Sequence, residues 1–225
     1  MIMISKRWKE FFRGAYIGAL ILKNVTNTTK TSALDALQKK TENDLRSMFA
    51  NYTRDSLKNL PTMKVYVDYY RRFKKSYHVL LQLESVVLNG KSLPKAPALV
   101  QVMFIAELKN LLLTAGHDLQ ALKMPLKIDV STGNERYTLL SGKDQVLKPG
   151  DMFLADGEGV VSSVIYGPDK RTRLKPETGD VLFVVYVPPG LNTQLVYEHL
   201  NDIKLSIMCF SSDINVEFLS VLGGP

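Results

Sequence analysis

The sequence predicts an α+β protein in which a helical N-terminal half packs on a C-terminal, β-sandwich-like sheet structure. Apolar residues recur at helical spacing through the first 124 residues, and after Pro125 the period shortens towards two while turn residues multiply. A chain of 225 residues that is 45% hydrophobic can bury a full core. No repeat or low-complexity linker separates the halves, so we expect residues 1–225 to form a single domain with one core.

The apolar run from Ala15 to Leu22 is the first predicted element. It follows basic residues, as in a signal peptide, but it is short and no small-residue cleavage site follows it, so we predict a core strand. The longer apolar stretch from 96 to 115 is interrupted by polar residues, which favours a buried helix over a membrane span. These residues are Gln101, Glu107, Lys109 and Asn110. We therefore expect no membrane contact and a cytoplasmic location.

Amphipathic helices are predicted on either side of Pro61. Each has an apolar stripe at positions i, i+3, i+4 and i+7, formed by Leu45, Met48, Phe49 and Tyr52 in the first and by Tyr66, Tyr69, Tyr70 and Phe73 in the second. A third helix is predicted from 77 to 88, where Asn89 and Gly90 stop it. A fourth opens at Pro97, is apolar on most sides through Leu113 and ends at Gly116.

Short strands separated by turns are predicted after Pro125. They cover residues 126–130, 136–140, 152–155, 160–166 and 181–187. A helix from Thr193 to about residue 202 follows, with Asn192 as its cap.

Charge is distributed unevenly along the chain. Residues 1–124 carry 20 Lys and Arg against 9 acids, a net charge of +11, and residues 125–225 carry 9 against 13, a net charge of −4, which together give +7. This asymmetry indicates that one part of the protein faces a polyanion. The alternative is a mixed-charge protein without such a partner.

The sequence contains no motif for a metal, a cofactor or a nucleophilic triad. His78, His117 and His199 are far apart in sequence, and there is no CxxC, HExxH or GxSxG pattern. The lone Cys209 lies among apolar residues, which predicts a packed small hydrophobe in a reducing compartment. We therefore expect neither a metal nor a cofactor.

The segment from Tyr66 to Tyr77 mixes aromatic and basic residues. Arg71 and Arg72 are candidate phosphate contacts, and an exposed Tyr would stack on an unpaired base. The alternative is that the tyrosines form the buried stripe of an amphipathic helix, which leaves only the cations for RNA.

A hydroxyl-bearing strand and the turn before it supply candidate pocket residues. Strand alternation points one hydroxyl of Ser162 and Ser163 inward, where it either bonds to a neighbouring backbone or lines a pocket. Asp156 and Glu158, in the preceding turn, either stand at the pocket rim or serve only as turn residues.

The basic turn YGPDKRTRLKPETG, residues 166–179, follows this strand. Asp169 is placed to cap the turn and thereby to aim the cations Lys170, Arg171 and Arg173 at an anion. Composition alone leaves open whether the turn is a phosphate contact or a solvated loop.

Several motifs occur in a specific order. They are Tyr70-Arg71-Arg72-Phe73, residues 83–94, Gly116-His117-Asp118-Leu119, Gly159-Val160-Val161-Ser162-Ser163, Tyr166-Gly167-Pro168-Asp169, Arg171-Thr172-Arg173 and Pro176-Glu177-Thr178. Over about residues 10–205, the ordered set resembles stand-alone relatives of the editing domain of the phenylalanyl-tRNA synthetase beta subunit, known as the B-three/four domain.

The resemblance implies a β-sandwich with packed helices that receives the 3′ end of a charged tRNA and hydrolyses a mischarged ester. It implies that Ser162, Ser163, Tyr166 and Thr172 line the substrate pocket and that a positioned water attacks the ester. Where the bacterial synthetase has Gly-x-Pro-x-His, this chain has Gln120 at the histidine position. Gln cannot act as a base, and His117, expected at a helix end, would point elsewhere.

These observations lead to one principal hypothesis and two alternatives. In the first, the chain binds an aminoacyl-tRNA 3′ end and hydrolyses its ester, with Glu158, Gln120 and Asp156 around the attacking water. Phosphates would then be contacted by five cations, Arg71, Arg72, Lys170, Arg171 and Arg173. In the second, the same pocket binds an RNA end or a small amino-acid-like ligand without turnover, and in the third it binds an unrelated metabolite.

Overall fold

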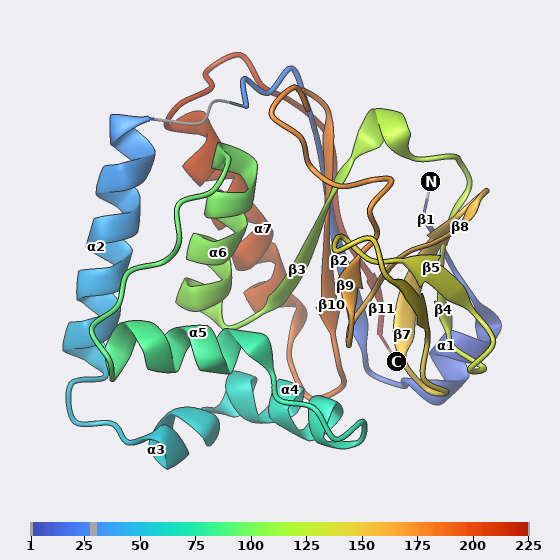
Figure 1. Ribbon diagram of the computed structural model, residues 1–225, viewed down its shortest axis with the longest axis horizontal. Coiled ribbons are helices and arrows are strands. Elements are labelled where there is room, and N and C mark those ends of the chain that lie inside the picture. Colours follow the sequence, from blue (N-terminus) through green and yellow to red (C-terminus); the bar gives the residue numbers. More distant parts are fainter. Residues whose placement is uncertain (1, 28–30, 225) are drawn as a thin grey trace.

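The computed structural model describes residues 2–27 and 31–224. A layer of helices covers one face of a four-stranded sheet, and a five-stranded sheet lies on the opposite side (Figure 1). The protein is therefore α+β, as the sequence predicts.

Helices and strands alternate irregularly along the chain. The helices are α1 (Lys6–Phe11), α2 (Ser32–Met48), α3 (Arg54–Lys58), α4 (Pro61–Arg71), α5 (His78–Val87), α6 (Ala98–Asn110) and α7 (Thr193–Met208), with a short 3-10 turn η1 (Leu119–Ala121). The strands are β1 (Ile2–Ile4), β2 (Tyr16–Lys23), β3 (Leu113–Asp118), β4 (Leu126–Val130), β5 (Arg136–Thr138), β6 (Asp144–Val146), β7 (Met152–Asp156), β8 (Gly159–Ser163), β9 (Gly167–Pro168), β10 (Val181–Val187) and β11 (Asn215–Gly223).

The two larger sheets combine strands from distant parts of the sequence. The central sheet has the order β11-β2-β10-β3, and all its neighbouring strands are antiparallel. The outer sheet has the order β1-β4-β7-β8-β9, in which only the β1–β4 pair is parallel among the described strands. β5 and β6 form a separate antiparallel pair. Strands β1, β2 and β3 thus come from the half that the sequence marks mainly as helical.

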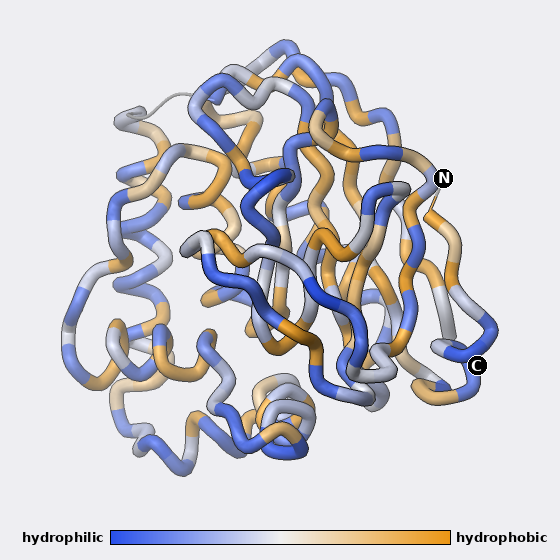
Figure 2. Tube along the Cα trace, turned by 45° about the vertical axis from the view of Figure 1, so that its right-hand side comes forward, coloured by the Kyte–Doolittle hydropathy of each residue, from blue (hydrophilic) through white to orange (hydrophobic). Residues whose placement is uncertain are grey.

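The core lies on both faces of the central sheet. All residues of β10 are buried, and one continuous cluster of buried apolar side chains extends from Trp8 in α1 to Ile207 in α7. Figure 2 shows apolar residues concentrated along the strands and hydrophilic residues along outer loops. Gly18 in β2 allows α7 to approach closely, because an added Cβ there would lie 2.6 Å from Val196 Cγ1.

Several predicted elements are confirmed. The apolar run at 15–22 forms β2, and the buried run at 181–187 forms β10. Asn192 caps α7 by accepting a hydrogen bond from the Leu195 amide at 2.9 Å, although this helix continues to Met208. Tyr66, Tyr69, Tyr70 and Phe73 are all buried, so these tyrosines belong to the core and do not stack on a base.

The predicted end of the fourth helix is wrong. Helix α6 stops at Asn110, Leu111 takes a left-handed conformation with φ 60°, and Gly116 lies inside β3. A segment that is apolar on most sides has no amphipathic period to mark where a helix gives way to a buried strand.

Two expectations about burial are also wrong. Met48 and Tyr52 are 66% and 38% exposed, so only Leu45 and Phe49 of the first predicted stripe are buried. Cys209 is exposed just after the last turn of α7 and is not a packed core residue. Met48 is the last residue of α2, Tyr52 lies beyond that helix, and Cys209 is the C-cap of α7. Helical periodicity does not predict which side chains are buried beyond the end of a helix.

Among the described residues, no helix has the length and apolar character needed to cross a membrane.

Candidate functional site

Asp169 caps the basic turn as predicted. Its carboxylate accepts a hydrogen bond from the Thr172 amide at 2.9 Å and another from the Thr172 hydroxyl. The Thr172 carbonyl accepts from the Asp118 amide at 2.8 Å, which ties the turn to the end of β3. The turn is therefore a fixed part of the structure.

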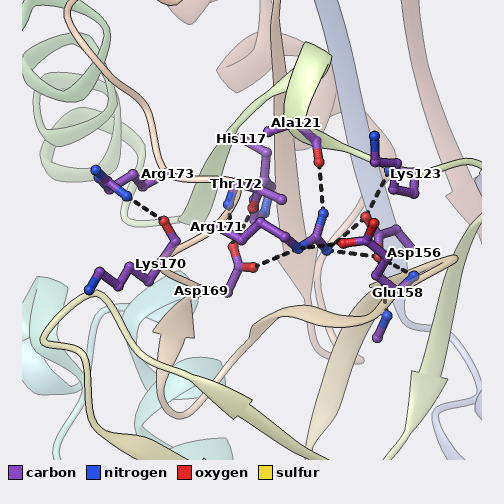
Figure 3. A network of polar contacts seen from close by, with 11 residues as sticks. His117, Ala121, Lys123, Asp156, Glu158, Asp169, Lys170, Arg171, Thr172 and Arg173 are labelled. Atoms are coloured by element: carbon purple, nitrogen blue, oxygen red, sulfur yellow. Dashed lines mark hydrogen bonds and ion pairs between the residues drawn. The ribbon is translucent and has the colours of Figure 1, made fainter.

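Arg171 points inward to Asp156. Its Nη2 atom lies 2.8 Å from both oxygens of that carboxylate, and its Nη1 atom donates to the Ala121 carbonyl at 2.7 Å (Figure 3). The Asp156 side chain is fully shielded from solvent. Although burial alone would raise the pKa of Asp156, the Lys123 amide and the Arg171 guanidinium lower it below its usual value.

Two further residues expected at the attacking water lie near this ion pair. Glu158 is half exposed, with an oxygen 3.4 Å from Arg171 Nε. Gln120 is exposed in η1, and its backbone amide donates to Asp118. The structure thus brings Asp156, Glu158 and Arg171 together, and it leaves the Gln120 side chain at the surface.

His117 occupies a buried network between the two sheets, contrary to the expectation that it lies on a helix end. It is a residue of β3, and its Nδ1 and Nε2 atoms lie 2.7 Å from Thr172 Oγ1 and 3.0 Å from Ser162 Oγ. Ser162 Oγ is in turn 2.6 Å from the Tyr186 hydroxyl. Burial lowers the pKa of His117 to about 3, so the imidazole is neutral near pH 7.

This network is an Asp–Thr–His–Ser–Tyr chain from Asp169 to Tyr186. A neutral imidazole donates through one nitrogen and accepts through the other, so His117 donates to one of the two hydroxyls and accepts from the other. The network joins β3, β8, β10 and the basic turn, and every polar side chain in it is buried and hydrogen-bonded. These hydrogen bonds stabilise the interface between the two sheets.

A cavity of about 530 Å³ lies between helices α4, α5 and α6 and the strands β3, β8, β9 and β10. Its wall is mainly apolar and includes Val100, Met103, Phe104, Leu113, Ile165 and Leu174. Exposed lining residues, His78, Leu140 and Arg173, mark its opening to solvent. A mainly apolar concavity with a few convergent polar groups has the character of a small-molecule site.

Three of the predicted site residues line this cavity. They are Ser163, Tyr166 and Arg173. Ser163 Oγ accepts from the Tyr166 amide at 3.2 Å, and Arg173 Nη1 donates to the Lys170 carbonyl at 2.8 Å. Ser162 and Thr172 lie behind the wall in the His117 network.

The predicted phosphate contacts have different environments. Arg71 is exposed and pairs with Asp68 at 2.7 Å, and Lys170 is exposed on the side of the turn away from Asp156 (Figure 3). Arg72 packs over four aromatic rings, with its guanidinium carbon 5.5 to 5.8 Å from their centroids. Arg72 therefore stabilises the junction of α1 and α4 through cation–π contacts.

Sequence reasoning did not place three residues at this site. Glu107 lines the cavity, Lys75 Nζ lies 4.7 Å from the Tyr166 ring, and His117 organises the network behind the wall. Glu107 could have been found from the sequence, because it is a carboxylate inside an apolar run and a carboxylate is costly to bury without a partner. Over residues 2–27 and 31–224, no group of His, Cys, Asp and Glu is arranged to hold a metal ion.

Comparison with known proteins gives a distant structural relationship. The chain is similar to an N-terminal fragment of the phenylalanyl-tRNA synthetase beta subunit from Pyrococcus horikoshii, with a TM-score of 0.49 and 12% sequence identity. The similarity covers 93% of this chain and 48% of the fragment, so the chain spans about half the length of that fragment. No protein-family model and no curated protein matches the sequence.

Proposed function

We propose that the protein binds the aminoacylated 3′ end of an RNA, with the amino-acid side chain in the cavity and the RNA outside it. One observation carries this proposal: the 530 Å³ apolar cavity opens beside a cation, Arg173. Apolar walls suit an amino-acid side chain, and a guanidinium suits a phosphate. The resemblance of the sequence motifs to an editing domain supports tRNA as the RNA.

Further cations extend from the cavity opening. Lys75 lies over the ring of Tyr166, which lines the cavity, and Lys170 is next to Arg173 along the basic turn. Neither lysine has an acidic partner within 4.0 Å among the described residues. They are therefore available to contact phosphates that follow the terminal nucleotide.

Binding is better supported than hydrolysis. Within the described chain, the cavity lining excludes Glu158, Gln120 and Asp156, and Asp156 is occupied by Arg171 and backbone amides. A general base must reach the water that it activates, directly or through one further water. The experiment below therefore also measures whether the ester is hydrolysed.

The test measures binding of the purified protein to aminoacyl-tRNA and uncharged tRNA at several salt concentrations. We expect tighter binding of the charged form and an affinity that falls as salt rises. Charge reversal at Arg173 and Lys75 should reduce the slope of log affinity against log salt by about one for each phosphate that the variant no longer neutralises. Lys6→Glu is the matched control, because Lys6 is an exposed cation on α1, away from the cavity.

Equal binding of charged and uncharged tRNA, or a salt slope that the Arg173 and Lys75 variants leave unchanged, would contradict the proposal. Release of the amino acid above the uncatalysed rate in the same mixtures would establish ester hydrolysis.

A further inference from the structure

Glu107 places a carboxyl group in the wall of the apolar cavity. It lies in the last turn of α6, is 1% exposed and lines the cavity together with Tyr70, Thr114 and Tyr186. The proposed function so far assigns no role to this group. A fully buried acid is rare in proteins unless it is paired.

Only one oxygen of Glu107 is used by the fold. Oε1 accepts a hydrogen bond from the Thr114 amide at 2.8 Å, and no hydrogen bond within the described residues engages Oε2. The other buried polar side chains of the wall have partners. Tyr70 donates to the Val164 carbonyl, and Thr114 contacts His199. Tyr186 contacts Ser162, and Ser163 accepts from the Tyr166 amide. The free hydrogen-bonding capacity of the buried wall is therefore concentrated on Oε2.

The surroundings of Glu107 supply no positive charge. Tyr66, Tyr70 and Tyr77 lie near it, and burial raises the pKa of each phenol, so all three are neutral. Burial lowers the pKa of His199, which contacts Thr114, to about 4, so this imidazole is also neutral at pH 7. Among the described lining residues, the permanently charged cation is Arg173 at the opening, while Tyr166, Tyr186 and His78 complete the titratable groups of the wall.

We propose that Glu107 selects ligands by their amino group, accepting hydrogen bonds from the ammonium of an amino-acid-like ligand whose apolar side chain occupies the cavity. This inference rests on the proposed function and specifies it further, because the ester or carboxyl end of such a ligand would lie towards Arg173. A desolvated carboxylate–ammonium pair forms charge-assisted hydrogen bonds, which are stronger than neutral ones.

Ligand binding should be linked to proton release. Burial raises the pKa of Glu107 to about 8, so the empty site holds a neutral carboxylic acid at pH 6.5. An ammonium group favours the carboxylate, and the displaced proton passes to the buffer. Binding should therefore release close to one proton per site at pH 6.5.

The experiment compares ligands that differ only in the amino group. Titration calorimetry of the full chain at pH 6.5 uses L-phenylalaninamide against 3-phenylpropionamide and L-leucinamide against 4-methylpentanamide, in two buffers of different ionisation enthalpy. We expect at least tenfold tighter binding of the better-fitting amine than of its deaminated partner, with proton release. Glu107→Gln should abolish both effects while it keeps an oxygen for the Thr114 amide, and Glu84→Gln, on α5 and outside the cavity lining, is the matched control.

Each outcome decides between the two proposals. If wild type binds both members of a pair equally, selection by Glu107 is wrong and the cavity proposal stands. If wild type binds none of the four compounds and does not prefer charged tRNA, both the proposed function and selection by Glu107 are wrong. If Glu107→Gln does not fold, the wild-type preference and its proton release still test the inference.

Discussion

Arg171 is the residue whose role differs most between the sequence and the structure. A cation in a basic turn suggests a phosphate contact, but Nη2 of Arg171 contacts both oxygens of a carboxylate that is shielded from solvent. Such a pair is expensive to break, because the remaining partner keeps its charge without compensation. Arg171 therefore stabilises the turn, and Arg173 is the arginine of this turn that reaches the cavity opening.

Arg171→Ala should lower the free energy of unfolding by about 3 kcal/mol at pH 7, since it leaves Asp156 unpaired. The Asp156 carboxylate has a lowered pKa, so its contribution is complete above the ordinary Asp pKa and is lost as the pH falls through the folded value. Urea unfolding of both proteins at pH 7 and pH 3 measures the difference, which should shrink at the lower pH. Arg173→Ala is the control, and a loss as large as that of Arg171→Ala would contradict this assignment.

Individual residues could be predicted from the sequence only where their partners are local. Asp169 caps a residue three positions away, and the sequence predicts that contact. His117 contacts Ser162, which is 45 positions away in the sequence. Arg71 and Arg171 both lie in basic segments, although only Arg171 pairs with a carboxylate that is shielded from solvent. Pairings across sheets depend on strand order, which a single sequence does not encode locally.

Strands and helices were predictable where their periodicity is clear. β2, β10 and α5 have recognisable boundaries, while β3 was assigned to a helix because residues 96–115 are apolar on most sides. This error also displaced His117, since the same residue points to different neighbours from a helix end and from a strand. Because residues 113–118 form a strand, His117 reaches the polar network and residues 113–116 line the cavity.

The contact between α7 and β2 depends on a missing side chain. Gly18→Ala would place a Cβ 2.6 Å from Val196 Cγ1 and 3.2 Å from Val185 Cβ. Overpacking of this kind typically costs about 1–3 kcal/mol, so we expect a loss of unfolding free energy in that range. In a Val196→Ala background, which lacks the contacted methyl group, Gly18→Ala should cost less unfolding free energy than it does in the wild type. Urea unfolding of the wild type, both single variants and the double variant measures this difference.

If Gly18→Ala is as stable as wild type, or if its cost is unchanged in the Val196→Ala background, the close approach of helix and strand is not what Gly18 provides.

The charge asymmetry of the chain has a structural counterpart in the whole molecule. A groove at the α3–α5 end is lined by Arg54, Lys58, Arg71 and Lys75, with Asp55 as its acid. Lys75 also contacts Tyr166 at the cavity, so this groove and the cavity share one basic segment. The composition predicts a polyanion partner, and the fold places one cation of the basic half, Lys75, against a residue of the cavity wall.

Four buried titratable groups give the whole molecule opposing dependences on pH. Burial lowers the pKa of His117 to about 3 and of His199 to about 4, from 6.5. Burial raises the pKa of Glu107 from 4.5 to about 8 and that of Asp151 from 3.8 to about 7. Between about pH 4.5 and 6.5, the histidines bind protons in the unfolded chain and are neutral in the folded chain. Over the same range the acids keep, in the folded chain, protons that they release in the unfolded chain.

These signs predict the shape of the stability curve. Between pH 4.5 and 6.5 His117 and His199 make stability rise with pH, and the two acids make it fall by a similar amount. Burial also lowers the pKa of His78, at the cavity opening, to about 4, so we expect a shallow net rise over this range. Above pH 6.5 the unfolded histidines lose their remaining protons, which adds a small rise that is complete by about pH 8. Glu107 and Asp151 then make stability fall by about 2 kcal/mol up to pH 8, because the unfolded chain binds fewer protons.

Glu107→Gln isolates the largest part of that fall. The amide does not titrate and can still accept from the Thr114 amide, so the variant should lose well under 1 kcal/mol between pH 6.5 and 8, a remainder due to Asp151. Urea unfolding at closely spaced pH values measures both curves. A wild-type curve that rises above pH 6.5, or equal falls in the two proteins, would show that Glu107 is ionised in the folded chain and would remove the basis for proton release on ligand binding.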